Sequence, residues 1–314
     1  MSEGHEALTS AADNDATHES VVSLWSAIRD SLRGSHHDYT AGPIGRSIVL
    51  LAIPMVLEMC MESIFAVVDI KRVSYLGPDA MATVGLTESL LTLIYAIAIG
   101  LSIGVTATVA RRIGEHNRDG AARAAVQAIF LGLLVAVVIA LIGAPSAPKL
   151  LALMGAAPAV IEHGVWFTRI MLAGNVTVVM LFMINAIFRG AGDAAIAMRV
   201  LWLANALNIV LGPCFIFGLG PFPKLGIAGA AVATNIGRGV GVLFAFSRLV
   251  RRGGRFDIRR EHFRIELPVM GRLVRLSATG TFQVFIGMAS WIGLRGRFPL
   301  SAPMLWLDTS SGFG

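Results

Sequence analysis

Residues 124–143 read AAVQAIFLGLLVAVVIALIG, twenty residues in a row without a charged side chain. A helix that crosses the hydrocarbon core of a bilayer needs about 20 mostly apolar residues, so this stretch is long enough to span a membrane. In hydrocarbon every backbone N–H and C=O must find a partner within the segment, which a helix provides and an open strand does not. The stretch therefore predicts a transmembrane helix.

Comparable apolar runs recur along the chain and are separated by turn residues such as Gly77-Pro78-Asp79. They predict six transmembrane helices and the start of a seventh, at about 47–70, 81–109, 124–143, 160–188, 194–219, 227–250 and 267–294. The composition agrees, because 15% of the residues are charged, against about 25% in soluble domains. The predicted fold class is an all-α integral membrane protein with a six-helix transmembrane lobe.

Composition divides the chain into five parts. Residues 1–42 form a polar tail, whose apolar residues at helical spacing predict either a short amphipathic surface helix or a disordered segment. Residues 43–250 form the six-helix lobe, 251–266 a basic linker, and 267–294 the first helix of a second lobe. Residues 295–314 lose the apolar periodicity, which leaves a truncated or frame-shifted reading and a natural short tail as the two interpretations.

The formal net charge of +6 comes from basic residues that lie between the apolar runs, which argues against a nucleic-acid binder. Most of them fall before the first span and after the second, fourth and sixth. The opposite loops hold only Lys71, Arg72, Lys149 and Lys224. Because basic loops stay on the cytoplasmic side, we expect a multi-pass protein of the bacterial inner membrane with a cytoplasmic amino terminus.

Three acidic residues lie inside the first predicted span: Glu58, Glu62 and Asp69. At about 100° per residue, Glu62 and Asp69 fall within about 40° of Glu58, so the three share one helix face. An ionisable group within a membrane costs about 2.5–3.5 kcal/mol to insert and is a functional candidate. Such a cluster either holds protons near neutral pH or attracts a cation such as Na⁺, as a cation-coupled carrier requires. The alternatives are that both glutamates only bond to other helices and that Asp69 lies near the outer headgroups.

Polar residues in the later spans form a second set of candidates, namely Asn175, Asn205, Asn208, Thr234 and Arg169. Side-chain amides within spans usually hold neighbouring helices together, at about 0.6–2 kcal/mol each. We expect Asn175, Asn205 and Arg169 to line a substrate cavity, with helix packing as the alternative.

Signatures of catalysis and of nucleotide binding are absent from the sequence. It holds no G-x-x-x-x-G-K-[ST] run, no H-E-x-x-H and no Cys/His ligand cluster. It therefore indicates neither an ATP-driven pump nor an enzyme, and no metal site.

Several short motifs together resemble the multidrug and toxic compound extrusion (MATE) family of transporters. They are Ala52-Ile53-Pro54 leading to Val67-Val68-Asp69, then Phe188-Arg189-Gly190-Ala191-Gly192-Asp193, Asn208-Ile209-Val210-Leu211 and residues 226–234. The resemblance covers residues 43–294 and implies a carrier of two six-helix lobes around a central cavity. Such a carrier lies in the lipid bilayer and expels drugs and organic cations in exchange for H⁺ or Na⁺, without another cofactor and without ATP or nucleic acid as a partner.

The resemblance also implies a coupling site. Asp69 matches the acid of the family's first helix, while Asn208 and Thr234 match an Asn and a Thr of a cation site on its fifth and sixth helices. Gly212 stands where that site has an Asp, so the site is incomplete, and Glu58 or Glu62 is the candidate to compensate. Lys71 and Arg72 form a second departure, because they occupy a stretch that is usually apolar.

Other functions remain open at this stage. A lipid-linked precursor flippase of the same superfamily would carry basic cavity residues, for which Arg169 and Arg238 are candidates. A non-transporting membrane scaffold is the third interpretation. Since one lobe lacks the partner needed for alternating access, we expect no transport unless a second lobe or a second copy is supplied.

Overall fold

The structure is a computed structural model that describes residues 44–251, 256 and 258–297. Over these residues it contains helices and turns and no strand. The elements are α2 (Ile44–Ser74), α3 (Pro78–Gly114), α4 (Arg118–Leu153), α5 (Pro158–Ala173), α6 (Asn175–Gly190), α7 (Ala194–Phe217), α8 (Ile227–Val250), η1 (Arg260–Phe263) and α9 (Leu267–Arg297). The predicted tail of residues 1–42 and residues 298–314 of the predicted last segment lie outside the described residues.

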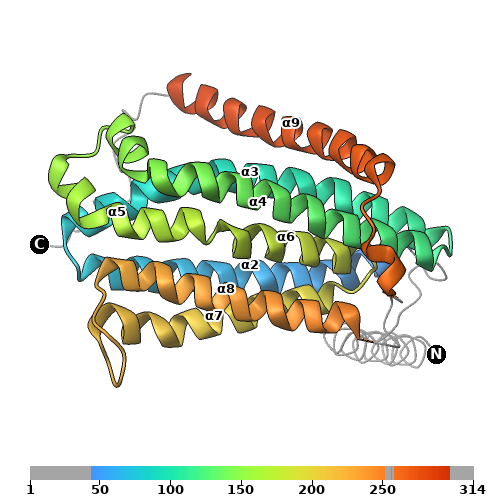
Figure 1. Ribbon diagram of the computed structural model, residues 1–314, viewed down its shortest axis with the longest axis horizontal. Helices are drawn as coiled ribbons and strands as arrows, with labels where there is room; N and C mark the ends of the chain where they lie inside the picture. The colour runs from blue at the N-terminus through green and yellow to red at the C-terminus, as the bar shows by residue number, and fades with distance from the viewer. Residues whose placement is uncertain (1–43, 252–255, 257, 298–314) are drawn as a thin grey trace, which may run out of the picture.

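The long helices lie side by side along the long axis of the molecule (Figure 1). α6 lies inside the bundle and contacts α3, α4, α7 and α8. α7 and α8 form an antiparallel pair, and α2 packs against α7 and α3. α9 runs along the outside of α3 (Figure 1).

The predicted spans coincide with helices, although not all in the predicted form. Five stretches of the described chain are long and apolar enough to cross a membrane: α3, α4, the α5–α6 pair, α7 and α8. α2 and α9 occupy the first and seventh predicted positions but are not among these five. α2 carries three acids, and Lys71 and Arg72 lie in its last turn.

The fourth predicted span is two helices, α5 and α6, that meet at Gly174. Asn175 donates its side-chain N–H to the Leu172 carbonyl at 2.6 Å, a carbonyl that in a continuous helix accepts from residue 176. Asn235 of α8 packs directly against the join, where a Cβ on Gly174 would lie 1.9 Å from its Oδ1. The predicted fourth span thus corresponds to one candidate membrane span, Pro158–Gly190, which is interrupted at Gly174.

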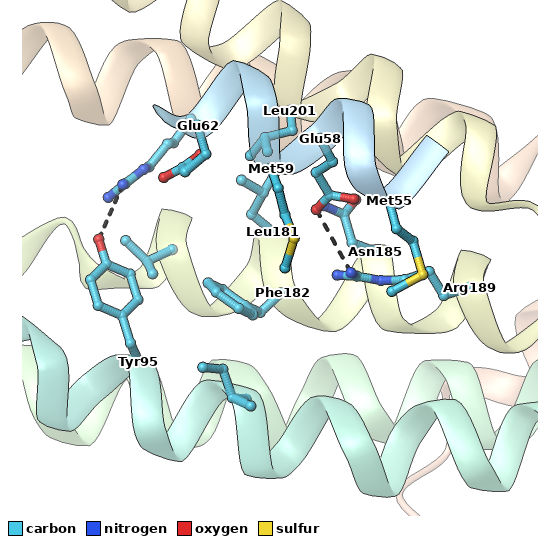
Figure 2. A pocket seen from close by; sticks show the side chains of 13 residues that line it. Met55, Glu58, Met59, Glu62, Tyr95, Leu181, Phe182, Asn185, Arg189 and Leu201 are labelled. Atoms are coloured by element: carbon cyan, nitrogen blue, oxygen red, sulfur yellow. Dashed lines mark hydrogen bonds and ion pairs between the residues drawn. The ribbon is translucent and has the colours of Figure 1, made fainter. Parts of the chain in front are cut away.

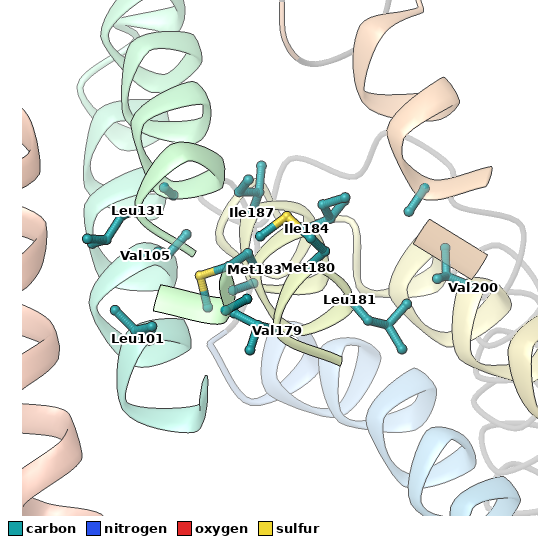
Figure 3. Close-up of a cluster of buried hydrophobic side chains, with 14 of the residues drawn as sticks. Leu101, Val105, Leu131, Val179, Met180, Leu181, Met183, Ile184, Ile187 and Val200 are labelled. Atoms are coloured by element: carbon teal, nitrogen blue, oxygen red, sulfur yellow. The ribbon is translucent and has the colours of Figure 1, made fainter. Parts of the chain in front are cut away.

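The core lies where α6 meets α3 and α4 (Figure 3). Its buried side chains are aliphatic and sulfur-containing: Leu101 and Val105 of α3, Leu131 of α4, and Met180, Met183, Ile184 and Ile187 of α6. Gly132 permits the close approach of α4 to α6, since a Cβ there would lie 2.6 Å from Cγ of Met183. Small residues that let helices approach closely are typical of membrane bundles, where packing replaces the hydrophobic effect between helices.

The outward face of α4 is apolar. Leu133, Leu134, Leu141 and Ile142 are exposed, two of them by more than 60%. Exposed apolar surface of this extent on a soluble protein would cause aggregation. It is the surface expected of a helix that faces lipid.

The segment that follows α8 is fixed to the start of α4; we call these contacts the linker latch. His262 is 2% exposed, and its Nε2 lies 2.7 Å from Oδ1 of Asp119. Gln127, also buried, donates to the Arg264 carbonyl at 2.6 Å and accepts from the Glu266 backbone N–H at 3.1 Å. The linker latch sets where α9 begins.

Candidate functional site

A cavity of about 320 Å³ lies between α2, α3, α6, α7 and α8 (Figure 2). Most of its wall is apolar, and the polar groups are few. The lining residues are Met55, Glu58, Met59 and Glu62 of α2, Tyr95 and Ile99 of α3, Val178, Leu181, Phe182, Asn185 and Arg189 of α6, Leu201 of α7 and Arg238 of α8. This combination of apolar walls and a small number of placed polar groups is typical of a binding site for small organic molecules.

One end of the cavity holds an ion pair. Glu58 and Arg189 point toward one another (Figure 2), with 3.7 Å between Oε1 and Nη1. The Glu58 side chain is 14% exposed and that of Arg189 is 25% exposed. Asn185 lies beside this pair (Figure 2), is buried, and its Oδ1 has no hydrogen-bond partner among the described residues. A free acceptor in a buried position is a group that a ligand can satisfy.

The other end of the cavity holds Glu62 and Arg238. Asn205 donates to Oε2 of Glu62 at 3.1 Å. Arg238 donates from Nη2 to the Tyr95 hydroxyl at 3.1 Å, while its Nη1 is buried without a partner among the described residues. Glu62 and Arg238 also interact through their charges.

The middle of the cavity is apolar, because Met59, Leu181 and Phe182 lie between the two polar ends (Figure 2). Each end therefore offers one carboxylate and one guanidinium across an apolar middle. A bound molecule can meet a donor, an acceptor or either charge at both ends.

Asp69 lies further along α2 than the two glutamates and is not part of this cavity lining. Its charge interacts with those of Arg72 and Arg238. Arg72 reaches across to α7, where its guanidinium donates to the carbonyls of Asn208 and Ile209. Arg72 thus interacts with Asp69 through its charge and with α7 through hydrogen bonds.

Asn208 and Thr234 are brought together, as the resemblance implied. Nδ2 of Asn208 donates to Oγ1 of Thr234 at 2.7 Å, and Thr234 donates in turn to the Ala230 carbonyl at 2.9 Å. Both side chains are buried. The two side chains are thus bonded directly to each other.

Gly212 and Arg72, which both depart from the family pattern, lie next to each other in the structure. A Cβ on Gly212 would lie 2.5 Å from Nη1 of Arg72. The guanidinium therefore occupies the space where a side chain at position 212 would begin. A protein-borne positive charge lies next to the Asn208 carbonyl.

Two expected cavity residues lie elsewhere. Asn175 is buried at the α5–α6 join and bonds to the carbonyls of Ala136 and Leu172. Arg169 lies over the ring of Trp166, with 5.2 Å from Cζ to the ring centroid. Neither lines this cavity. Asn205 contacts the cavity through Glu62.

Sequence reasoning missed Tyr95 and Arg189. Tyr95 is one of three tyrosines in the chain, and its position in the middle of a predicted apolar run is a signal for a polar contact. The sequence places Arg189 with the basic loop residues, because it directly precedes the turn Gly190-Ala191-Gly192-Asp193. In the structure it still belongs to α6 and points inward.

The MatE family model matches residues 54–214, just over half of the chain. A probable multidrug resistance protein NorM from Thermotoga maritima is 31% identical over 199 residues, which cover 63% of this chain and 43% of that protein. A FAD transporter from Shewanella oneidensis is 30% identical over 202 residues, covering 63% and 44% respectively. The chain thus spans less than half the length of these two relatives.

Solved structures give the same picture. A transporter of the MOP superfamily from Pyrococcus furiosus is 32% identical with a TM-score of 0.74, over 85% of this chain and 57% of that one. The outward-facing conformation of a multidrug resistance MATE family transporter matches with the same identity, TM-score and coverage. The helical bundle and these matches agree, and the chain belongs to the MatE family.

Proposed function

We propose that this chain is part of a secondary active transporter that expels drugs and other small organic molecules, organic cations among them, by antiport with H⁺ or Na⁺. The observation that carries the proposal is the pair of glutamates, Glu58 and Glu62, in an otherwise largely apolar cavity of a helical bundle. Ionisable groups inside a membrane bundle are costly and mark substrate or ion pathways.

Antiport requires that substrate and coupling ion cannot both be held at once. A carboxylate that accepts either a proton, a sodium ion or an organic cation meets this requirement through direct competition. Glu58 already has a cationic partner in Arg189. Glu62 has an amide from Asn205 and no ion pair within 4 Å among the described residues, and is our candidate for this competition. Asp69 is the second candidate, with its charge modulated by Arg72.

The alternative functions receive less support. A flippase for an anionic lipid needs an excess of basic groups in the cavity, whereas Arg189 and Arg238 are balanced there by two glutamates. Arg169, the other basic candidate, lies against Trp166 instead. A scaffold has no need for ionisable groups around a cavity. Transport itself needs a second lobe or a second copy of this lobe for alternating access.

Binding of an organic cation to the purified chain in detergent tests the proposal without requiring transport. Equilibrium dialysis measures the binding of tetraphenylphosphonium, an organic cation. If H⁺ is the competing ion, we expect this cation to bind more weakly as the pH falls. If Na⁺ is the competing ion, we expect weaker binding as the Na⁺ concentration rises. A competing ion lowers the apparent affinity by up to about tenfold for each tenfold increase in its concentration.

The variant Glu62→Gln should bind the cation at least about tenfold more weakly, by analogy with other lost charge contacts. It should also lose the dependence on pH or Na⁺. Glu115→Gln is the matched control, because that carboxylate lies between α3 and α4 and pairs with Arg111 and Arg112 outside the cavity. Binding that ignores both ions, or that survives Glu62→Gln unchanged, would refute the competition.

A further inference from the structure

A second pocket, of about 480 Å³, lies where the end of α3, the start of α4 and the start of α9 meet. These three helix ends lie together at one end of the bundle, next to η1 (Figure 1). α3 and α4 contain 37 and 36 residues, which is about 55 Å at 1.5 Å per residue. Since the hydrocarbon core is about 30 Å thick, we expect this pocket, at the ends of such long helices, to lie at the level of the lipid headgroups.

The pocket carries more positive than negative side chains. Four arginines line it, Arg111, Arg112, Arg123 and Arg272, against two acids, Asp119 and Glu266. Both acids are already engaged: Arg123 lies 2.9 Å from Asp119 and 3.7 Å from Glu266. Asp119 also takes part in the linker latch.

The positive charges of the other three arginines have few carboxylates nearby to neutralise them. Arg111 and Arg112 share one carboxylate, that of Glu115, which is not part of the pocket lining. Arg272 has no ion pair or hydrogen bond with any described residue. The exposed guanidinium of Arg111 and that of Arg272, which has no partner within the described part of the chain, thus border the same space from α3 and α9.

Apolar residues complete the pocket. Val269 and Leu276 of α9 and Ala107 of α3 belong to its lining, and Leu276 is 47% exposed. A basic rim that continues into an apolar wall fits a molecule with a phosphate at one end and a hydrocarbon chain at the other. Guanidinium groups bind phosphate oxygens in pairs, and basic pockets between helices at the membrane surface bind anionic lipid headgroups.

We propose that this pocket binds the phosphate group of an anionic phospholipid, with an acyl chain along Val269 and Leu276. A phospholipid and a soluble phosphate ester offer the same phosphate group to the arginines. The apolar wall of the pocket favours the lipid, because only the lipid has a hydrocarbon chain to place there. None of the residues involved lines the cavity between α2 and α8. The lipid-site proposal can therefore be tested, and rejected, independently of the transport proposal.

Native mass spectrometry of the purified chain, titrated with phosphatidylglycerol or phosphatidylcholine, measures the two lipid affinities directly. We expect phosphatidylglycerol to bind at least about fivefold more tightly, which is the factor contributed by one basic residue near an anionic headgroup. Arg272→Gln should weaken phosphatidylglycerol by about the same factor. Arg275→Gln is the matched control, because Arg275 is an exposed arginine of the same helix that lies outside the pocket lining.

Glu266→Gln provides a change of the opposite sign, since it removes an acid from the pocket and should tighten phosphatidylglycerol binding. A loss of folding cannot imitate this gain. Equal affinity for the two lipids, or equal losses in Arg272→Gln and Arg275→Gln, would overturn the site. Displacement of the lipid by millimolar glycerol 3-phosphate would instead identify a site for soluble phosphate esters and overturn the lipid assignment.

Discussion

The contact between Arg72 and Gly212 can be tested by a double-mutant cycle. Arg72 donates to two carbonyls of α7, and the bond to Asn208, at 3.4 Å, is long. A hydrogen bond from a charged donor contributes about 1.5–3 kcal/mol. Counting the shorter bond and little for the longer one, we expect Arg72→Ala to lower the free energy of unfolding by about 2 kcal/mol.

The second arm of the cycle is Gly212→Ala, whose effect should change sign with the background. With Arg72 present, the new Cβ would lie 2.5 Å from Nη1, so the guanidinium has to shift, and we expect it to lose its bonds to the two carbonyls. The loss of about 2 kcal/mol then outweighs a gain of about 1 kcal/mol from replacing Gly by Ala in a helix. In the Arg72→Ala background only the gain remains, so the coupling energy is about 2 kcal/mol.

Unfolding of the purified chain by SDS in mixed micelles, followed by circular dichroism, measures each corner of the cycle. Lys71→Ala is the control, because Lys71 is the exposed neighbour of Arg72 and should change stability by less than about 0.5 kcal/mol. If Gly212→Ala has the same effect with and without Arg72, the guanidinium does not occupy the space at position 212 and the reasoning fails.

Three further outcomes follow from single contacts. Thr234→Val leaves Nδ2 of Asn208 buried without its acceptor and should cost about 1–3 kcal/mol in the same SDS assay; an unchanged midpoint would show that the pair is not formed. Gly104→Val places a side chain 2.5 Å from Oγ of Ser277, so it should push α9 away and abolish disulfide cross-linking between cysteines introduced into α3 and α9, whereas retained cross-linking would contradict this packing. Asn175→Ala removes the amide that bridges the α5–α6 join and should speed hydrogen exchange there, and equal exchange in both proteins would count against the bridge.

The helices could be located from the sequence because apolar runs of about 20 residues are typical of membrane-spanning helices. The join at Gly174 could not, since glycine is common inside transmembrane helices. Two side chains contact the join: the amide of the neighbouring residue Asn175, and Asn235, which comes from α8. That second contact exists only once the chain has folded.

The sequence predicted the candidate site only where helical periodicity determines which side chains share a helix face. Glu58 and Glu62 are four residues apart, so they share a face of α2, and the structure places both at the cavity. Arg169 was expected at a cavity, with helix packing as the alternative, and in the structure its guanidinium lies over the ring of Trp166, three residues earlier. The partner carbonyls of Arg72 lie 136 and 137 residues away in sequence, a separation over which no local pattern extends.

The linker latch has a consequence for how the lobe is made on the ribosome. The hydrogen-bond partners of Gln127, Arg264 and Glu266, lie 137 and 139 residues later in the chain. At about 5–20 residues per second, that interval is on the order of ten seconds of synthesis. During it the start of α4 has a polar side chain whose final partners do not yet exist. The first helices can therefore enter the membrane early, but this end of the lobe matures only after its last helix has been translated.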